Sequence, residues 1–237
     1  MSTNANNKKG QNESKYLDYF CDEDKLAKII DEQNIMLNFI AYKNIIKYEK
    51  CVCKIEIKEK IYATGFFVYI PSKEIRVLIT NNHIINKEFL VKEKELKIYI
   101  VNDLDEIEKT INLKSDRFKF TDEQIDATII EILDEDLIED FFEVDEEYIK
   151  GNEFLNEKIF NFQFPKVGQL NASSGKIISL RNNNKQFIHD AGTLAGSSGS
   201  PIILTNGYKI IGLHKGTFKD NYNNFGKKKN VGVYLNK

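Results

Sequence analysis

Residues 196–201 read Gly-Ser-Ser-Gly-Ser-Pro, and no other stretch of the chain is as informative. Glycines flank the Ser197-Ser198 pair, and glycine permits the backbone angles of a tight turn that presents a side chain. Gly196 lies two residues before Ser198, so both backbone N–H groups can point at one spot, as an oxyanion hole requires. The stretch predicts a nucleophilic Ser198 with an oxyanion hole formed by Gly196 and Ser198. The alternative is a surface turn that leads into a strand.

A histidine follows a strand-like segment much earlier in the chain. Residues 78–85 read Leu-Ile-Thr-Asn-Asn-His-Ile-Ile, which is an apolar run, a short polar turn and then His83. A histidine held by packed neighbours at the end of a strand is well suited to act as a general base. A single histidine is more often structural, but the serine turn downstream favours the catalytic interpretation of His83.

A carboxylate is needed to orient such a histidine. Residues 125–132 read Ile-Asp-Ala-Thr-Ile-Ile-Glu-Ile, so Asp126 directly precedes an apolar strand. Asp116 and Asp122 are the alternatives, but neither is followed directly by a strand. The chain order His83, Asp126, Ser198 is one of the orders in which a Ser-His-Asp triad occurs.

The chain divides into four parts by its residue pattern. Residues 1–15 are polar and are predicted to be a disordered tail. Residues 16–47 carry apolar residues at helical spacing and predict a helical extension. Residues 48–145 and 146–237 each hold about six short, β-branched segments separated by turn residues, which favours an all-β fold of barrels or sandwiches.

Composition limits the function classes. The net charge of the 237 residues is −2, which gives no indication of nucleic-acid binding. No apolar run is long enough for a signal peptide or a membrane span, so we expect a cytoplasmic protein without a membrane partner. The three cysteines are too few for a disulfide framework. Cys51 and Cys53 could form half of a metal site, but we expect reduced strand cysteines and neither a metal nor an organic cofactor.

The combined motifs resemble the chymotrypsin-like serine protease superfamily. The resemblance covers roughly residues 50–237 and rests on five stretches: ATGFFV at 63–68, LITNNH at 78–83, DATIIEI at 126–132, GSSGSP at 196–201 and IGLHKG at 211–216. It implies two six-stranded antiparallel barrels with the active site between them. His83 and Asp126 would belong to the first barrel (48–145) and Ser198 to the second (146–237). It also implies a serine endopeptidase that acts on a protein or peptide substrate through an acyl-enzyme.

The residue before the nucleophile departs from the digestive members of that superfamily. They carry an aspartate there, which pairs with a new N-terminal amine after activation cleavage, whereas this chain has Ser197. Ser197 offers no charge to such an amine. We therefore expect that this protein is not activated through that ion pair.

Three further positions suggest a cleavage specificity. Gly192 stands where trypsin-like enzymes carry the carboxylate that selects Lys or Arg, and the nearby Asp190 is a weaker candidate for that role. Thr193 and His214 resemble the residues that bind an acidic or glutamine side chain in glutamyl endopeptidases and picornaviral cysteine proteases. The resemblance implies cleavage after Glu or Gln, because a hydroxyl and an imidazole can both donate to a carboxylate or amide oxygen. The alternative is that His214 only completes the pocket wall, and His189 is expected to be an ordinary strand residue.

Other functions are compatible with parts of this pattern. A protease fold without catalysis could bind peptides or protein partners. An esterase could use the same triad, but the G-x-S-x-G elbow and the Ser-Asp-His order of α/β-hydrolases are absent. The helical extension could be a structural strap, a partner-binding segment or a regulator of the cleft.

Overall fold

The computed structural model describes residues 46–58, 61–102, 105–145, 147–148, 154–218 and 229–235. Residues Asn44–Lys237 form one compact unit. The predicted disordered tail and nearly all of the predicted helical extension lie outside the described residues, as does Cys21. Within the described ranges, no helix has both the length and the apolar character needed to cross a membrane.

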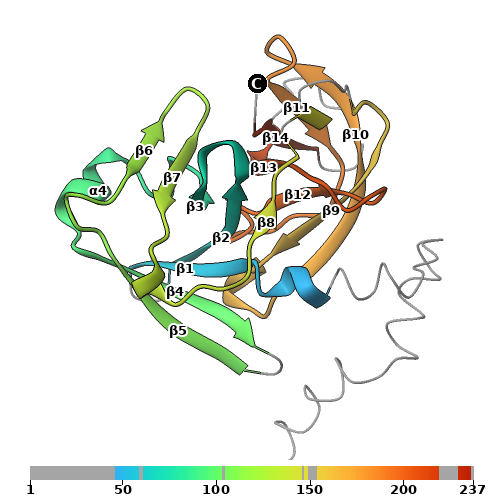
Figure 1. Ribbon diagram of the computed structural model, residues 1–237. Helices are drawn as coiled ribbons and strands as arrows, with labels where there is room; N and C mark the ends of the chain where they lie inside the picture. The colour runs from blue at the N-terminus through green and yellow to red at the C-terminus, as the bar shows by residue number, and fades with distance from the viewer. Residues whose placement is uncertain are drawn as a thin grey trace, which may run out of the picture. The chain divides into compact units, whose positions relative to one another are not determined.

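The first half of this unit is an open eight-stranded sheet (Figure 1). Seven strands follow the order β5-β4-β1-β2-β3-β7-β6 and pair antiparallel, and β8 pairs in parallel with β2. The strands are β1 (Val52–Lys58), β2 (Ile61–Ile70), β3 (Ile75–Thr80), β4 (Glu95–Asn102), β5 (Asp105–Asn112), β6 (Lys119–Asp122), β7 (Ala127–Glu131) and β8 (Phe142–Glu143).

The second half is a closed barrel of six antiparallel strands. Around the barrel the order is β10-β11-β14-β13-β12-β9, and β9 closes onto β10. The strands are β9 (Lys158–Gln163), β10 (Asn171–Arg181), β11 (Gln186–His189), β12 (Pro201–Leu204), β13 (Ile210–Thr217) and β14 (Asn230–Tyr234). Figure 1 shows the barrel beside the sheet, and η3 (Pro165–Val167) of the barrel half contacts β2.

Helix is scarce in the described chain. Between the strands of the described residues lie α4 (Lys87–Lys92) and the 3-10 turns η1 (Pro71–Lys73), η2 (Asp134–Asp136) and η3 (Pro165–Val167). The prediction of a mostly β protein is therefore confirmed.

The prediction of two six-stranded barrels is wrong for the first half, which is an open sheet. Closure would need β5 to pair with β6, but β5 pairs with β4 and β6 pairs with β7. Most residues of β5 are exposed, and Asp105, Glu106 and Glu108 lie along it. Charged residues of this kind are typical of an edge strand that is kept from further pairing.

Two strands were not predicted from the sequence. β6 and β8 are short, and β8 lies inside the acidic stretch from Asp134 to Glu147. β8 pairs with Val68 and Tyr69 of β2, just beyond the point where β1 stops pairing with that strand. A two-residue strand leaves no periodic signal, so only the tertiary pairing reveals it.

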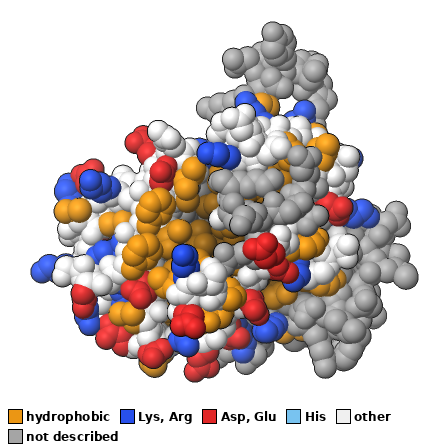
Figure 2. All heavy atoms as spheres, turned by 45° about the horizontal axis from the view of Figure 1, so that its top comes forward, with side chains coloured by type: hydrophobic (Ala, Val, Ile, Leu, Met, Phe, Trp, Pro, Cys, Tyr) orange, Lys and Arg blue, Asp and Glu red, His pale blue; other side chains and the backbone are white. Residues whose placement is uncertain are grey.

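Each half has its own apolar core. In the sheet, buried side chains such as Phe67, Leu78 and Ile98 pack together. In the barrel, the Phe187 ring lies directly against the backbone of Gly232, where a Cβ atom would stand 2.3 Å from the ring. Burying each large apolar side chain stabilises the fold by about 1.5–3 kcal/mol. Figure 2 shows basic and acidic side chains mixed around an apolar band on the face it presents.

Candidate active site

His83 is held by a carboxylate from a neighbouring loop. It lies in the turn after β3, where the buried Asn81 side chain donates to the Asp126 carbonyl oxygen at 3.0 Å. The His83 backbone N–H donates to Asp126 Oδ1 at 2.9 Å. The ring nitrogen Nδ1 lies 2.9 Å from Oδ2 and 3.0 Å from Oδ1. A carboxylate can only accept, so Nδ1 carries the proton and Nε2 is left with its lone pair.

Asp126 reaches this position through an unusual backbone conformation. It immediately precedes β7, it is 6% exposed, and its φ angle is +56°. Aspartate is one of the few residues with a side chain that adopts this left-handed region readily. The Lys215 ammonium of β13 lies 3.9 Å from Asp126 Oδ2, so the carboxylate faces a cation as well as the imidazole.

The other candidate carboxylates do not contact His83 within the described residues. Asp122 Oδ1 instead accepts from the backbone N–H groups of Gln124 and Ile125 and closes the turn that leads to Asp126. Asp126 is thus the carboxylate that the structure brings to His83.

The serine turn is a compact loop that is closed by its own hydrogen bonds. The Ser197 hydroxyl accepts from the Leu194 N–H at 3.0 Å, and the Ser197 carbonyl accepts from the Ser200 hydroxyl at 2.6 Å. Gly196 has φ +94° and Gly199 has φ +85°. Ser197 is fully buried whereas Ser198 is half-buried, so the loop hides the first serine and presents the second.

The backbone around Gly196 leaves two donors available. The Ala195 carbonyl accepts from the Lys166 N–H at 2.7 Å, which directs that carbonyl towards η3. In a trans peptide the N–H points away from the carbonyl, so the Gly196 N–H faces away from Lys166. Within the described residues neither the Gly196 N–H nor the Ser198 N–H donates to an acceptor. This is the arrangement that an oxyanion hole needs before substrate binds.

Ser198 and His83 come from different halves of the fold. The Ser198 carbonyl accepts from the Thr64 N–H of β2 at 3.0 Å, which ties the serine loop to the sheet that carries His83. Among the described residues no hydrogen bond joins the Ser198 hydroxyl to His83. In structures without substrate this hydrogen bond is often long, and it shortens when substrate binds.

The segment that contains Gly192 and Thr193 is held by hydrogen bonds to buried polar side chains. The Gly192 carbonyl accepts from Gln163 Nε2 at 2.9 Å, and no atom lies within 4 Å of where a Cβ of Gly192 would be. The Thr193 hydroxyl donates to Asn230 Oδ1 at 2.9 Å, and Asn230 Nδ2 donates to the Ala191 carbonyl at 2.8 Å. No described atom fills the space beside Gly192.

His214 has a buried partner that the sequence did not reveal. His189 Nε2 lies 3.2 Å from His214 Nδ1, and His189 is completely buried while His214 is 2% exposed. Burial lowers the pKa of His189 to about 4, although Asp190 opposes the shift. His189 is therefore neutral near neutral pH. It is a residue of strand β11, as expected, and its pairing with His214 follows from barrel closure, which leaves no local signal in the sequence.

The protonation of this histidine pair follows from an unsatisfied atom. His189 Nδ1 is buried and has no hydrogen-bond partner. A buried N–H without a partner costs more than a lone pair without one, because a strong donor loses its hydration. This places the proton of neutral His189 on Nε2, where His214 Nδ1 can accept it.

Comparisons with known proteins find similar structures but no similar sequences. No protein-family model matches the sequence, and no curated protein matches it. Among solved structures, the serine endoprotease from Yersinia pestis matches with a TM-score of 0.61 at 12% identity over 84% of this chain. The Rv3671c protease from M. tuberculosis in its active form matches with a TM-score of 0.55 at 16% identity over 81% of this chain. An HtrA-type protease, AlgW with a tripeptide, matches with a TM-score of 0.58 at 15% identity over 82% of this chain.

The chain has the fold of the chymotrypsin-like and HtrA-type serine proteases. It spans 64% of the length of the Yersinia endoprotease, 78% of the Rv3671c protease and 60% of AlgW. At 12–16% identity the likeness concerns the fold alone.

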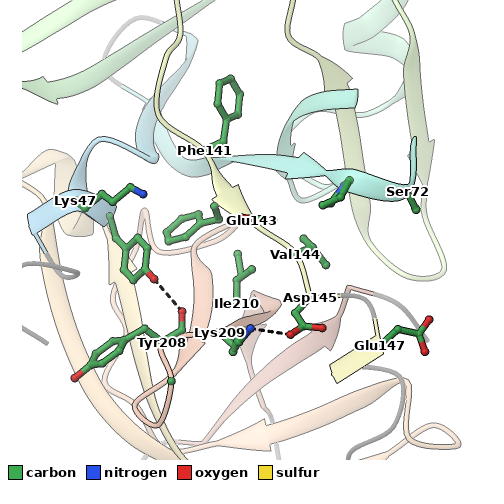
Figure 3. Close-up of a pocket in the computed structure, with 14 residues that line it drawn as sticks. Lys47, Ser72, Phe141, Glu143, Val144, Asp145, Glu147, Tyr208, Lys209 and Ile210 are labelled. Carbon is green, nitrogen blue, oxygen red and sulfur yellow. Dashed lines mark hydrogen bonds and ion pairs between the residues drawn. The ribbon is translucent and has the colours of Figure 1, made fainter. Parts of the chain in front are cut away.

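A cavity of about 610 Å³ lies elsewhere in this protease fold. It is lined from both halves, and Figure 3 shows two contacts across it. Lys209 Nζ pairs with Asp145 Oδ2 at 2.7 Å, and the Tyr48 hydroxyl donates to the Tyr208 carbonyl at 3.2 Å. None of His83, Asp126 and Ser198 lines it, so it is separate from the candidate active site.

Two of the cysteines are free and buried. Burial raises the pKa of Cys51 to about 12 and raises that of Cys53 as well, so both are neutral thiols. The described ranges contain no group of three or more His, Cys, Asp or Glu residues that could hold a metal ion.

Proposed function

We propose that the protein is a serine endopeptidase, with Ser198 as nucleophile, His83 as general base and Asp126 as the residue that orients the base. The observation that carries this proposal is the two-point contact of Asp126 with His83, through the backbone N–H and through Nδ1. It fixes both the orientation and the tautomer of the imidazole. The protease fold and the presented Ser198 support the same reaction.

The proposed reaction uses these groups in two half-reactions. His83 Nε2 takes the proton of the Ser198 hydroxyl as its oxygen attacks the scissile carbonyl. The N–H groups of Gly196 and Ser198 hold the oxyanion that forms, and Asp126 stabilises the resulting imidazolium. His83 then gives the proton to the leaving amine, and water, deprotonated by His83, hydrolyses the acyl-enzyme.

Cleavage after Glu or Gln forms part of the proposal. The resemblance of Thr193 and His214 to the residues that bind an acidic or glutamine side chain in glutamyl endopeptidases and picornaviral cysteine proteases supports this specificity. The Thr193 hydroxyl donates to Asn230 Oδ1, so its oxygen keeps lone pairs that a substrate amide can use.

An activity-based probe tests the catalytic proposal. A fluorophosphonate should label the wild-type protein, and Ser198→Ala should abolish labelling because the reacting hydroxyl is gone. Ser115→Ala, which alters an exposed serine in the sheet half, should label like wild type. An unlabelled wild type, or equal labelling of Ser198→Ala, would contradict the proposal.

A peptide library tests the specificity separately. Wild type should cut most efficiently after Gln or Glu, and His214→Leu should lose that preference. A preference for Arg, Phe or Leu would refute the assignment of the pocket and leave the triad unaffected.

The second candidate function is an inactive protease fold that binds peptides. If this function were correct, wild type would bind library peptides without cutting them, and Ser198→Ala would bind them equally well.

A further inference from the structure

Thr64 of β2 has an unusual set of contacts for a strand residue. It is completely buried, and its backbone and its hydroxyl are both bonded to residues of the barrel half. The N–H donates to the Ser198 carbonyl at 3.0 Å, and the hydroxyl donates to the Gly196 carbonyl at 2.8 Å. Thr64 thus holds the serine loop at two points, one at the nucleophile and one two residues before it.

The Thr64 hydroxyl also accepts a hydrogen bond from the other side. The Phe164 N–H, which immediately precedes η3, donates to Thr64 Oγ1 at 3.1 Å. The next contact of this segment is the Lys166 N–H with the Ala195 carbonyl. The Thr64 hydroxyl is therefore bonded both to the Gly196 carbonyl and to the segment 164–166. The Lys166 N–H of that segment holds the Ala195 carbonyl.

The same threonine is linked to the histidine side. The Thr80 hydroxyl donates to the Thr64 carbonyl at 2.9 Å, and Thr80 is the last residue of β3, three residues before His83. Gly199 packs on this pair so closely that a Cβ atom would stand 2.1 Å from the Thr64 carbonyl oxygen. Both hydrogen bonds that join residues 194–200 to the sheet in the described structure involve Thr64.

We propose that Thr64 is a positioning residue that holds the oxyanion-hole peptide of Gly196 and sets Ser198 against His83 across the two halves of the fold. The inference rests on the proposed serine endopeptidase function. Thr64 touches neither substrate nor a reacting atom, and it acts through Gly196, Ser198 and Phe164. A misplacement of about 1 Å in such a constellation can cost a factor of about 100 in rate.

Thr64→Val tests the role of the hydroxyl. Valine keeps the branched shape that suits a strand, but it leaves the Gly196 carbonyl and the Phe164 N–H buried without partners. We expect kcat to fall about 10- to 100-fold with KM changed by less than about threefold, because the loss falls on the transition state. Thr64→Ser keeps the hydroxyl and should retain most of kcat.

A matched control shows whether a Thr→Val substitution lowers kcat wherever it is made. Thr110→Val makes the same change at an exposed position of β5 and should leave kcat unaltered. If Thr64→Val does not fold, Thr64→Ser and Thr64→Ala give the same contrast. Both lack the γ-methyl group, and only serine has the hydroxyl.

The outcomes distinguish this inference from the proposed function. If wild type is labelled by fluorophosphonate and Ser198→Ala is not, the proposed function holds and the Thr64 variants can be assessed by their labelling rates. Slow labelling of Thr64→Val with rescue by Thr64→Ser supports the inference. Wild-type kinetics in Thr64→Val, or equal impairment of Thr64→Ser and Thr64→Ala, overturns it. An unlabelled wild type overturns the proposed function first.

Discussion

Asp126 illustrates how one residue combines a conformational and an electrostatic role. Its left-handed backbone turns the carboxylate back towards His83, and its charge faces the imidazole and Lys215. Asparagine tolerates this backbone region nearly as well as aspartate, whereas alanine does so at a cost of about 1 kcal/mol. Two substitutions can therefore separate the two roles.

We predict that Asp126→Asn and Asp126→Ala both lower kcat by roughly 10⁴-fold, because both remove the charge that sets the tautomer of His83. Asp126→Asn should keep nearly the wild-type free energy of unfolding. Asp126→Ala should lose about 1 kcal/mol more than Asp126→Asn. Steady-state kinetics and urea unfolding measure the two effects. If Asp126→Asn were active to within tenfold of wild type, Asp126 would not be the orienting carboxylate.

At the scale of elements, the edge strands β5 and β6 of the open sheet do not pair with each other, and a buried ion pair stabilises the connection between them. Arg117 lies in the connection between the edge strands β5 and β6, and its side chain is fully buried. It donates to the Glu131 carbonyl of β7 at 2.8 Å and pairs with Asp136 of η2, through Nη2 and Oδ1 at 3.0 Å. The guanidinium thus ties the connection to the strand next to β6.

We predict that Arg117→Met destabilises the protein by about 3–5 kcal/mol, because it leaves the Asp136 carboxylate buried without a counter-charge. The matched control is Arg76→Met, which breaks the exposed pair with Asp134 and should cost at most about 1 kcal/mol. Urea unfolding monitored by circular dichroism measures both. Equal effects of the two variants would show that burial of the pair is not decisive.

At the scale of the whole molecule, the barrel buries a neutral histidine that the unfolded chain would protonate. His189 has a pKa near 4 in the fold, whereas an unfolded histidine has a pKa near 6.5. Between these values the unfolded state binds more protons, so stability is lost as pH falls from about 6.5 towards about 4. Above this window both states are neutral and His189 adds no pH dependence.

We predict that the free energy of unfolding falls by about 2 kcal/mol from this group between about pH 7 and pH 5. His189→Phe should abolish this part of the pH dependence, even if the lost bond to His214 lowers stability at both pH values. Urea unfolding of both proteins at the two pH values gives the comparison. A variant as pH-sensitive as wild type would show that another group is responsible.

The sequence by itself determined most of the strands and singled out the candidate catalytic residues. Ser198 between its glycines, His83 after an apolar run and Asp126 before another are local patterns, and twelve predicted strand segments coincide with strands of the structure. Local patterns survive in a linear sequence because turn geometry and side-chain alternation act over a few residues.

Only the tertiary structure decided that one half closes into a barrel while the other stays open, and which contacts hold the serine loop. The open edge between β5 and β6, the His189–His214 pair and the Thr64 contacts with the serine loop all join residues far apart in the chain. Such pairings depend on which strands meet, and one sequence carries no periodic signal of that choice. Ser198 thus lies in a turn that the local sequence predicts, and contacts with β2 of the other half hold that turn in place.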